Sequence, residues 1–147
     1  MKLSALRQAI RDLVTATTVP SSAHWAGVTS LRHVATMDLD APGLDGHHLT
    51  FVVEHRSSDY PDRRRGTQRS RSMFDVLVQV AARISTIDGE TDTDAGLDVA
   101  EAIRDQLNVA TGEVPLAVES ILSVGVDGTG TRYTYRLSVA AIHDTGA

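Results

Sequence analysis

The first stretch of the chain has apolar residues at the spacing of an amphipathic helix. The apolar positions, three or four residues apart, are Leu3, Leu6, Ile10 and Leu13. Charged residues, among them Arg7, Arg11 and Asp12, lie on the opposite side of the predicted helix. The β-branched run at residues 15–19 and then Pro20 should end it, because proline cannot continue a helix. We expect a loop over residues 20–27.

Two strands are predicted next, at residues 33–40 and 48–56. Apolar residues alternate with polar ones in both, and in the second Leu49, Phe51 and Val53 share one face. Residues 41–46 between them contain Pro42, Gly43 and Gly46, which are turn formers. The pattern therefore predicts a β-hairpin.

Residues 57–72 have no hydrophobic period, and we expect a long exposed connection there. The strand pattern that follows, at residues 73–85, is the clearest in the chain. Its apolar positions on one face are Phe74, Val76, Val78, Val80, Ala82 and Ile84. Such strict alternation is typical of a strand with one buried face.

An acidic turn at residues 86–94 precedes a second predicted helix at about residues 95–108. Asp92 or Thr93 can accept hydrogen bonds from the first free amides, and the carboxylates suit the positive end of the helix dipole. Ala100, Ile103 and Leu107 form its apolar stripe, joined by Leu97 or Val99.

A second hairpin is predicted at residues 117–126 and 131–143, because the intervening Asp-Gly-Thr-Gly is a strong turn signal. On its first strand we expect one shared face; the residues are Val118, Leu122, Val124 and Val126. On its second strand the shared face is expected to hold Tyr133, Tyr135, Leu137, Val139 and Ala141.

These elements predict the α+β class. We expect a mostly antiparallel sheet of about five strands, made of two hairpins plus a central strand, packed against two helices, with a long arginine-rich loop. The 147 residues fit a single domain covering 1–147, and no internal repeat is visible.

Composition narrows the class of protein. The chain has no cysteine, which excludes disulfides, zinc–thiolate sites and thiol nucleophiles. No apolar run approaches the roughly 18 residues of a membrane span. Charges at Lys2, Arg7, Arg11 and Asp12 interrupt the N-terminal apolar positions, so we expect no signal peptide and no membrane partner.

The sequence contains no convincing motif for metal binding, phosphate binding or catalysis. Adjacent His47 and His48 should point to opposite faces of a strand, so they do not predict a metal site, and we interpret them as turn or strand-end residues. The acidic run at residues 88–94 lacks the glycine and the glutamate of a calcium loop, and helix capping explains it better. No glycine motif precedes a helix, and no nucleophile motif is present. We therefore predict no catalytic residue, no metal, no cofactor and no enzymatic activity.

The arginine-rich segment is the one unusual feature. The net charge is −5, yet five arginines fall within nine residues: Arg63, Arg64, Arg65, Arg69 and Arg71. A solvated loop is the simplest interpretation. The functional interpretation is an intermolecular contact with tail-tube protein, with a neighbouring copy or with DNA, because guanidinium groups bind phosphates and carboxylates well.

The succession of elements resembles the tail terminator (tail-completion) proteins of long-tailed bacteriophages. The resemblance covers most of the chain: the helix LSALRQAIRDLV, the strand ending FVVEHRSS, a polar loop, the strand SMFDVLVQVAARIS, the helix DAGLDVAEAIRDQLN, and the strands AVESILSVGVDG and RYTYRLSVAAIHD. No site residue transfers with it, since the pattern contains no catalytic or ligand residue.

The resemblance implies a role in virion assembly. It implies a homo-oligomer, a hexameric ring, that caps the tail tube, ends its polymerisation and joins the tail to the head through a neck protein, with DNA passing through the lumen. The protein would be assembled in the host cytoplasm and remain in the virion. Alternatives are a neck or head-closure connector, a nucleic-acid-binding module that uses the 63–71 arginines, and an enzyme of unrecognised type.

Overall fold

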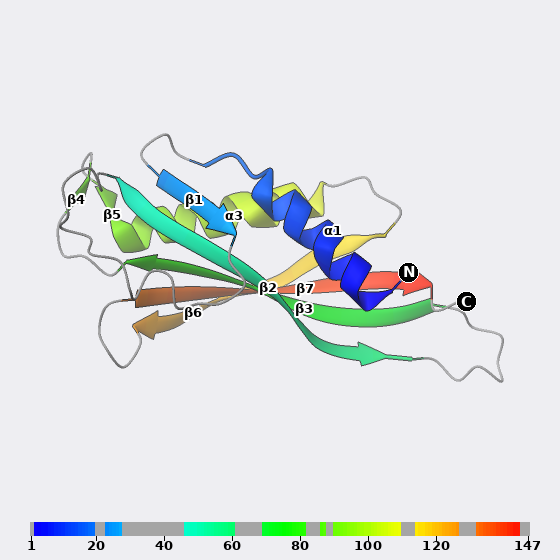
Figure 1. Cartoon of the computed structure of the whole chain (residues 1–147). Helices are drawn as coiled ribbons and strands as arrows, with labels where there is room; N and C mark the ends of the chain where they lie inside the picture. The colour runs from blue at the N-terminus through cyan, green and yellow to red at the C-terminus, as the bar shows by residue number, and fades with distance from the viewer. Residues whose placement is uncertain are drawn as a thin grey trace.

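A strongly twisted sheet with both helices on one of its faces organises the fold (Figure 1). The computed structural model describes residues 2–19, 23–27, 46–60, 69–81, 86–87, 90–109, 114–126 and 132–144. The helices are α1 (Leu3–Thr15) and α3 (Asp92–Asn108). The strands are β1 (Ala23–Gly27), β2 (His47–Asp59), β3 (Arg69–Ala81), β4 (Thr86–Ile87), β5 (Glu90–Thr91), β6 (Leu116–Val126) and β7 (Arg132–Asp144).

The strand order is β1-β2-β3-β7-β6, with β4 and β5 paired apart from the main sheet. The α+β class with two helices and a mostly antiparallel sheet is confirmed. The second predicted hairpin is present as the antiparallel pair of β6 and β7. The predicted number of antiparallel strands is wrong: the antiparallel part has four strands, β2, β3, β7 and β6, and the fifth strand of the sheet, β1, is parallel to its neighbour. The predicted strand at residues 33–40 lies outside the described residues.

The remaining strand of the main sheet, β1, was predicted as a loop. It pairs in parallel with the first half of β2, from Ala23 opposite His47 to Gly27 opposite Phe51. The indole of Trp25 stacks on the Phe51 ring with centroids 4.7 Å apart. Offset stacking of this kind adds to the burial of both rings. The pairing of residues 23–27 with β2 therefore outweighs the loop-forming composition of this part of the sequence.

The core lies between the sheet and the two helices. The predicted strand at residues 73–85 is present as β3, which covers Arg69–Ala81, and Phe74, Val76, Val78 and Val80 are buried on the face that the helices cover. The other two predicted positions, Ala82 and Ile84, lie outside the described residues. From the helices, the buried residues that meet them are Leu6, Ile10, Val14, Val99, Ala100, Ile103 and Leu107. Among the described helices, none is long and apolar enough to cross a membrane.

The strand β6 departs from its predicted pattern. Its register with β7 shifts between Val118 and Ser120 and again between Ser123 and Gly125. Each bulge inserts a residue and turns the following side chains to the other face. The expected common face is therefore wrong: Val118 packs against the core together with Ile121, while Leu122 is exposed.

The connection between β2 and β3 is shorter than predicted. Strand pairing continues to Asp59 opposite Arg71, so the segment between the strands covers residues 60–68 rather than 57–72. At this end the two strands are also joined by a side-chain hydrogen bond between Ser58 Oγ and Ser72 Oγ, at 2.6 Å. A hydrophobic pattern does not reveal a contact between polar side chains.

Candidate functional site

The structure describes the backbone of only two of the five candidate arginines. Arg63, Arg64 and Arg65 lie outside the described residues. Arg69 and Arg71 belong to β3 rather than to a loop. The arginine-rich loop predicted over residues 63–71 is therefore not confirmed as a unit, and its last part is strand.

The side chain of Arg71 is paired with a carboxylate of the same sheet. Its guanidinium forms an ion pair with the Glu119 carboxylate on β6, across the intervening strand β7. Both side chains are nearly half exposed, so the pair contributes at most about 1 kcal/mol to stability. Its charge is nevertheless compensated locally, which makes Arg71 a weaker candidate for binding phosphate than the sequence suggests.

A second arginine, Arg56, ties three strands together on the face that the helices leave uncovered. Its Nε donates to Asp75 Oδ2 at 3.2 Å, and its Nη2 donates to Ser138 Oγ at 2.7 Å. The hydrogen bond to Asp75 raises the pKa of Arg56 above its ordinary value. The group spans β2, β3 and β7 and holds their register.

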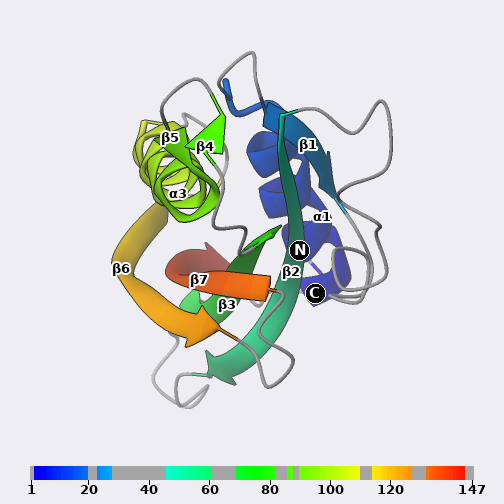
Figure 2. The same ribbon diagram turned by 90° about the vertical axis from the view of Figure 1, so that its left-hand side faces the viewer.

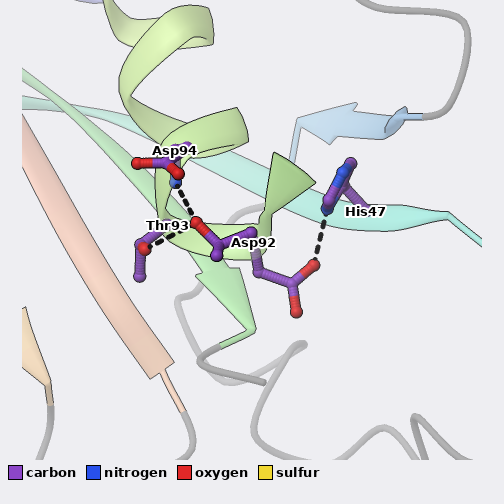
Figure 3. Close-up of polar contacts among 5 residues, drawn as sticks. His47, Asp92, Thr93 and Asp94 are labelled. Carbon is purple, nitrogen blue, oxygen red and sulfur yellow. Dashed lines mark hydrogen bonds and ion pairs between the residues drawn. The ribbon is translucent and has the colours of Figure 1, made fainter. Parts of the chain in front are cut away.

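His47 and Asp92 form a fully buried pair that the sequence did not predict (Figure 3). The imidazole Nδ1 lies 2.7 Å from Asp92 Oδ1, joining the start of β2 to the first turn of α3. Asp92 is therefore not the helix cap, and His47 is a strand-end residue, as predicted, but a buried one with a partner on α3. The two lie 45 positions apart in sequence, so no local motif marks them.

The cap of α3 is Thr91, one residue before the predicted candidates. Its hydroxyl oxygen accepts a hydrogen bond from the backbone N–H of Asp94 at 3.2 Å. The cap and the buried pair fix the same helix turn from two sides, as Figure 3 shows for Asp92 and Asp94. Within the described residues, no group of three or more metal-ligating side chains is present around them.

A hydrogen-bonded chain of serines and histidines closes the other end of β2, β3 and β7. Ser58 Oγ lies 2.8 Å from His55 Nε2, and Ser72 Oγ lies 2.7 Å from His143 Nε2; the two hydroxyls bond each other. Ser72 and His143 are buried, so a substrate cannot reach the serine hydroxyl. The arrangement joins three strands and does not resemble an exposed nucleophile.

Tyr135 has a phenol that is less acidic than usual. Burial raises its pKa to about 12, with smaller contributions from Tyr133, Asp94 and Asp98. Its hydroxyl donates to the backbone carbonyl of Thr93 at 2.8 Å. Tyr135 therefore stays protonated near neutral pH and anchors the start of α3 to β7.

The outer edge of β6 is the most unusual surface of the described residues. Among the described strands, β6 is the last of the main sheet and has a neighbour on one side only, β7. Three large aliphatic side chains on it are exposed: Leu122 at 48%, Val124 at 55% and Val126 at 52%. A long edge strand with exposed aliphatic residues is a site where another chain can add.

Two grooves lie beside the edges of the sheet. One, of about 400 Å³, is lined by Arg7, Gln8 and Arg11 of α1 and by Val52 and Val53 of β2. The other, of about 390 Å³, lies between α3 and β6 and is lined by Leu97, Glu101, Arg104, Val118, Glu119, Ser120, Ile121 and Ser123. The first groove therefore lies beside the part of β2 that β1 does not pair with, and the second lies beside the edge strand β6.

Comparison with known proteins adds no family assignment. No protein-family model matches the chain, and no curated protein shows significant sequence similarity to it.

Proposed function

We propose that this protein is a structural component of a virion, a tail terminator that forms a ring on the end of a phage tail tube. The observation that carries the proposal is the outer edge of β6, an 11-residue strand with Leu122, Val124 and Val126 exposed. Monomeric proteins protect such edges with charges, prolines or covering segments. A ring buries the edge of every protomer against the next protomer and leaves no edge open.

The resemblance of the element order to tail terminator proteins supports the same role. The described structure keeps much of that order: an N-terminal helix, two long strands joined by a polar segment, a second helix and a final strand pair. The polar groups also favour a structural role. His47 with Asp92, and Ser72 with His143, are buried and connect elements of the fold.

The proposed partners follow from the role. One face of the ring would contact the tube protein, the other a neck protein, and DNA would pass through the lumen. The 63–71 segment remains a candidate contact, with Arg69 and Arg71 placed at the beginning of β3. Because Arg71 is paired with Glu119, contact with DNA would rest mainly on the other arginines.

The test is a tube-growth assay with purified tube protein. Adding this protein at the start of polymerisation should limit tube length, and adding it later should stop further growth. Tubes that lengthen without limit in its presence would contradict the terminator role. Binding to the neck connector with no effect on tube growth would instead indicate a head-closure protein.

A further inference from the structure

One edge of the sheet has a groove whose lining carries two arginines and no carboxylate. The exposed carboxylates of the same two elements lie outside this lining: Asp12, Glu54 and Asp59. The pairing of β1 with β2 ends at Phe51, so from Val52 onward the outer side of β2 has no strand neighbour among the described residues. The groove along this stretch is lined by Arg7 and Arg11 of α1. Arg7 is exposed, and the Arg11 guanidinium lies over the Phe51 ring, 5.7 Å from its centroid.

The opposite edge of the sheet is acidic. The exposed carboxylates of α3 are Asp94, Asp98, Glu101 and Asp105, and Arg104 is the only basic residue of that helix. Arg104 donates to Asp105 at 3.1 Å, so these two charges offset each other. No ion pair of Asp98 or Glu101 is found among the described residues, and Glu101 lines the groove beside β6.

The two edges lie on opposite sides of the molecule. Figure 2 shows α3 beside β6 on one side and α1 beside β1 and β2 on the other. The strand order agrees, because β6 ends the sheet at one side and β2 with its short neighbour β1 ends it at the other. Each side thus presents a helix, a groove and an edge strand, with opposite charges on the two helices.

We propose that the acidic α3–β6 edge of one copy binds the basic α1–β2 edge of a second copy. Opposite charges across a contact select the partner and its orientation, and like charges placed there cost several kcal/mol. The exposed Leu122 and Val124 of β6 would supply the apolar area of the contact. Because the two surfaces differ, the contact is heterologous, and repeating it produces a ring or a filament.

This inference rests on the proposed function, since it specifies which surfaces join the protomers of the ring. The charges that carry it are solvent-exposed, so the contact should weaken as salt rises. The Debye length falls from about 10 Å at 0.1 M salt to about 3 Å at 1 M salt. Sedimentation velocity should therefore show smaller assemblies at high salt.

The decisive experiment reverses the charge of each edge separately. In Arg7→Glu with Gln8→Glu the α1 edge becomes acidic, and in Asp98→Arg with Glu101→Arg the α3 edge becomes basic. All four positions are exposed on helices, so circular dichroism should show folded protein for both variants. Each variant alone then has two edges of the same sign, and we expect assembly to need at least about tenfold more protein than the unchanged chain.

Mixing the two variants in equal amounts should restore assembly, because each edge again meets an edge of opposite sign. The matched control is Ala5→Glu with Ala9→Glu, which adds negative charge to exposed positions of α1 that do not line the groove. The control should assemble like the unchanged chain. Variants that assemble normally on their own, or a mixture that does not recover, would overturn the proposed contact.

The outcomes separate this inference from the proposed function. If the unchanged chain limits tube growth and both charge variants do so equally well, the contact is wrong and the terminator role stands. If the mixture recovers assembly but the assemblies leave tube growth unaffected, the contact stands and the terminator role is wrong. A chain that stays monomeric under all conditions would contradict both.

Discussion

Replacing Asp92 with alanine removes the carboxylate that lies 2.7 Å from His47 Nδ1 inside the fold. Both side chains are fully buried, so water cannot take the place of the lost acceptor. Losing a buried hydrogen-bond partner costs about 1–3 kcal/mol, and breaking a buried ion pair costs about 3–5 kcal/mol. We therefore expect Asp92→Ala to lower the free energy of unfolding by about 3 kcal/mol, a large part of the roughly 5–15 kcal/mol typical of a domain.

Urea unfolding followed by circular dichroism measures this loss as a lower midpoint with an unchanged slope. Protein concentration must be low and constant, because assembly raises the apparent stability. The matched control is Asp98→Ala, an exposed carboxylate on the same helix, which should change the free energy of unfolding by no more than about 0.5 kcal/mol. The double variant with His47→Ala should cost less than the sum of the single changes. Equal losses for Asp92→Ala and Asp98→Ala would refute the stabilising role of the buried pair.

Three further predictions concern stability. Thr91→Ala removes the cap of α3 and should cost about 1 kcal/mol in urea unfolding, whereas Thr91→Ser should cost much less. Leu137→Ala opens a cavity at a fully buried position and should cost about 2–5 kcal/mol, whereas Val109→Ala, at an exposed position, should be nearly neutral; similar costs would contradict the placement of the core. The pKa of Tyr135 is raised from 10.0 to about 12, so the folded state holds the phenol proton more tightly; its contribution to stability is complete below pH 10.0 and is lost as the pH rises to about 12. In Tyr135→Phe the alkaline loss of stability over this range should be shallower, and an unchanged pH profile would contradict the assignment.

The strand β3 and the helices were predictable because their patterns are local. Phe74, Val76, Val78 and Val80 recur at every second position, and all four are buried in the structure. In α1, spacing predicted Leu6 and Ile10 as buried residues, which is confirmed. Periodicity is reliable where one face of an element meets one core over its whole length.

The errors arise where the deciding contact is distant or where the register shifts. The register shift between Val118 and Ser120 places Leu122 on the outside, and the hydrophobic period of the sequence does not reveal it. Residues 23–27 form a strand because they pair with β2, where the Trp25 ring stacks on the Phe51 ring; these contacts join residues that are distant in the sequence. The candidate site could be predicted even less well, since the opposed charges of α1 and α3 become meaningful only when the sheet places them at opposite edges.

The most direct test of the account is electron microscopy of the purified protein, alone and mixed with tail tubes, with sedimentation velocity on the same samples. A tail terminator should form closed rings of a single size, present in solution or at the ends of the tubes. A protein that sediments as a single chain at every concentration and leaves the tube ends bare would contradict the account.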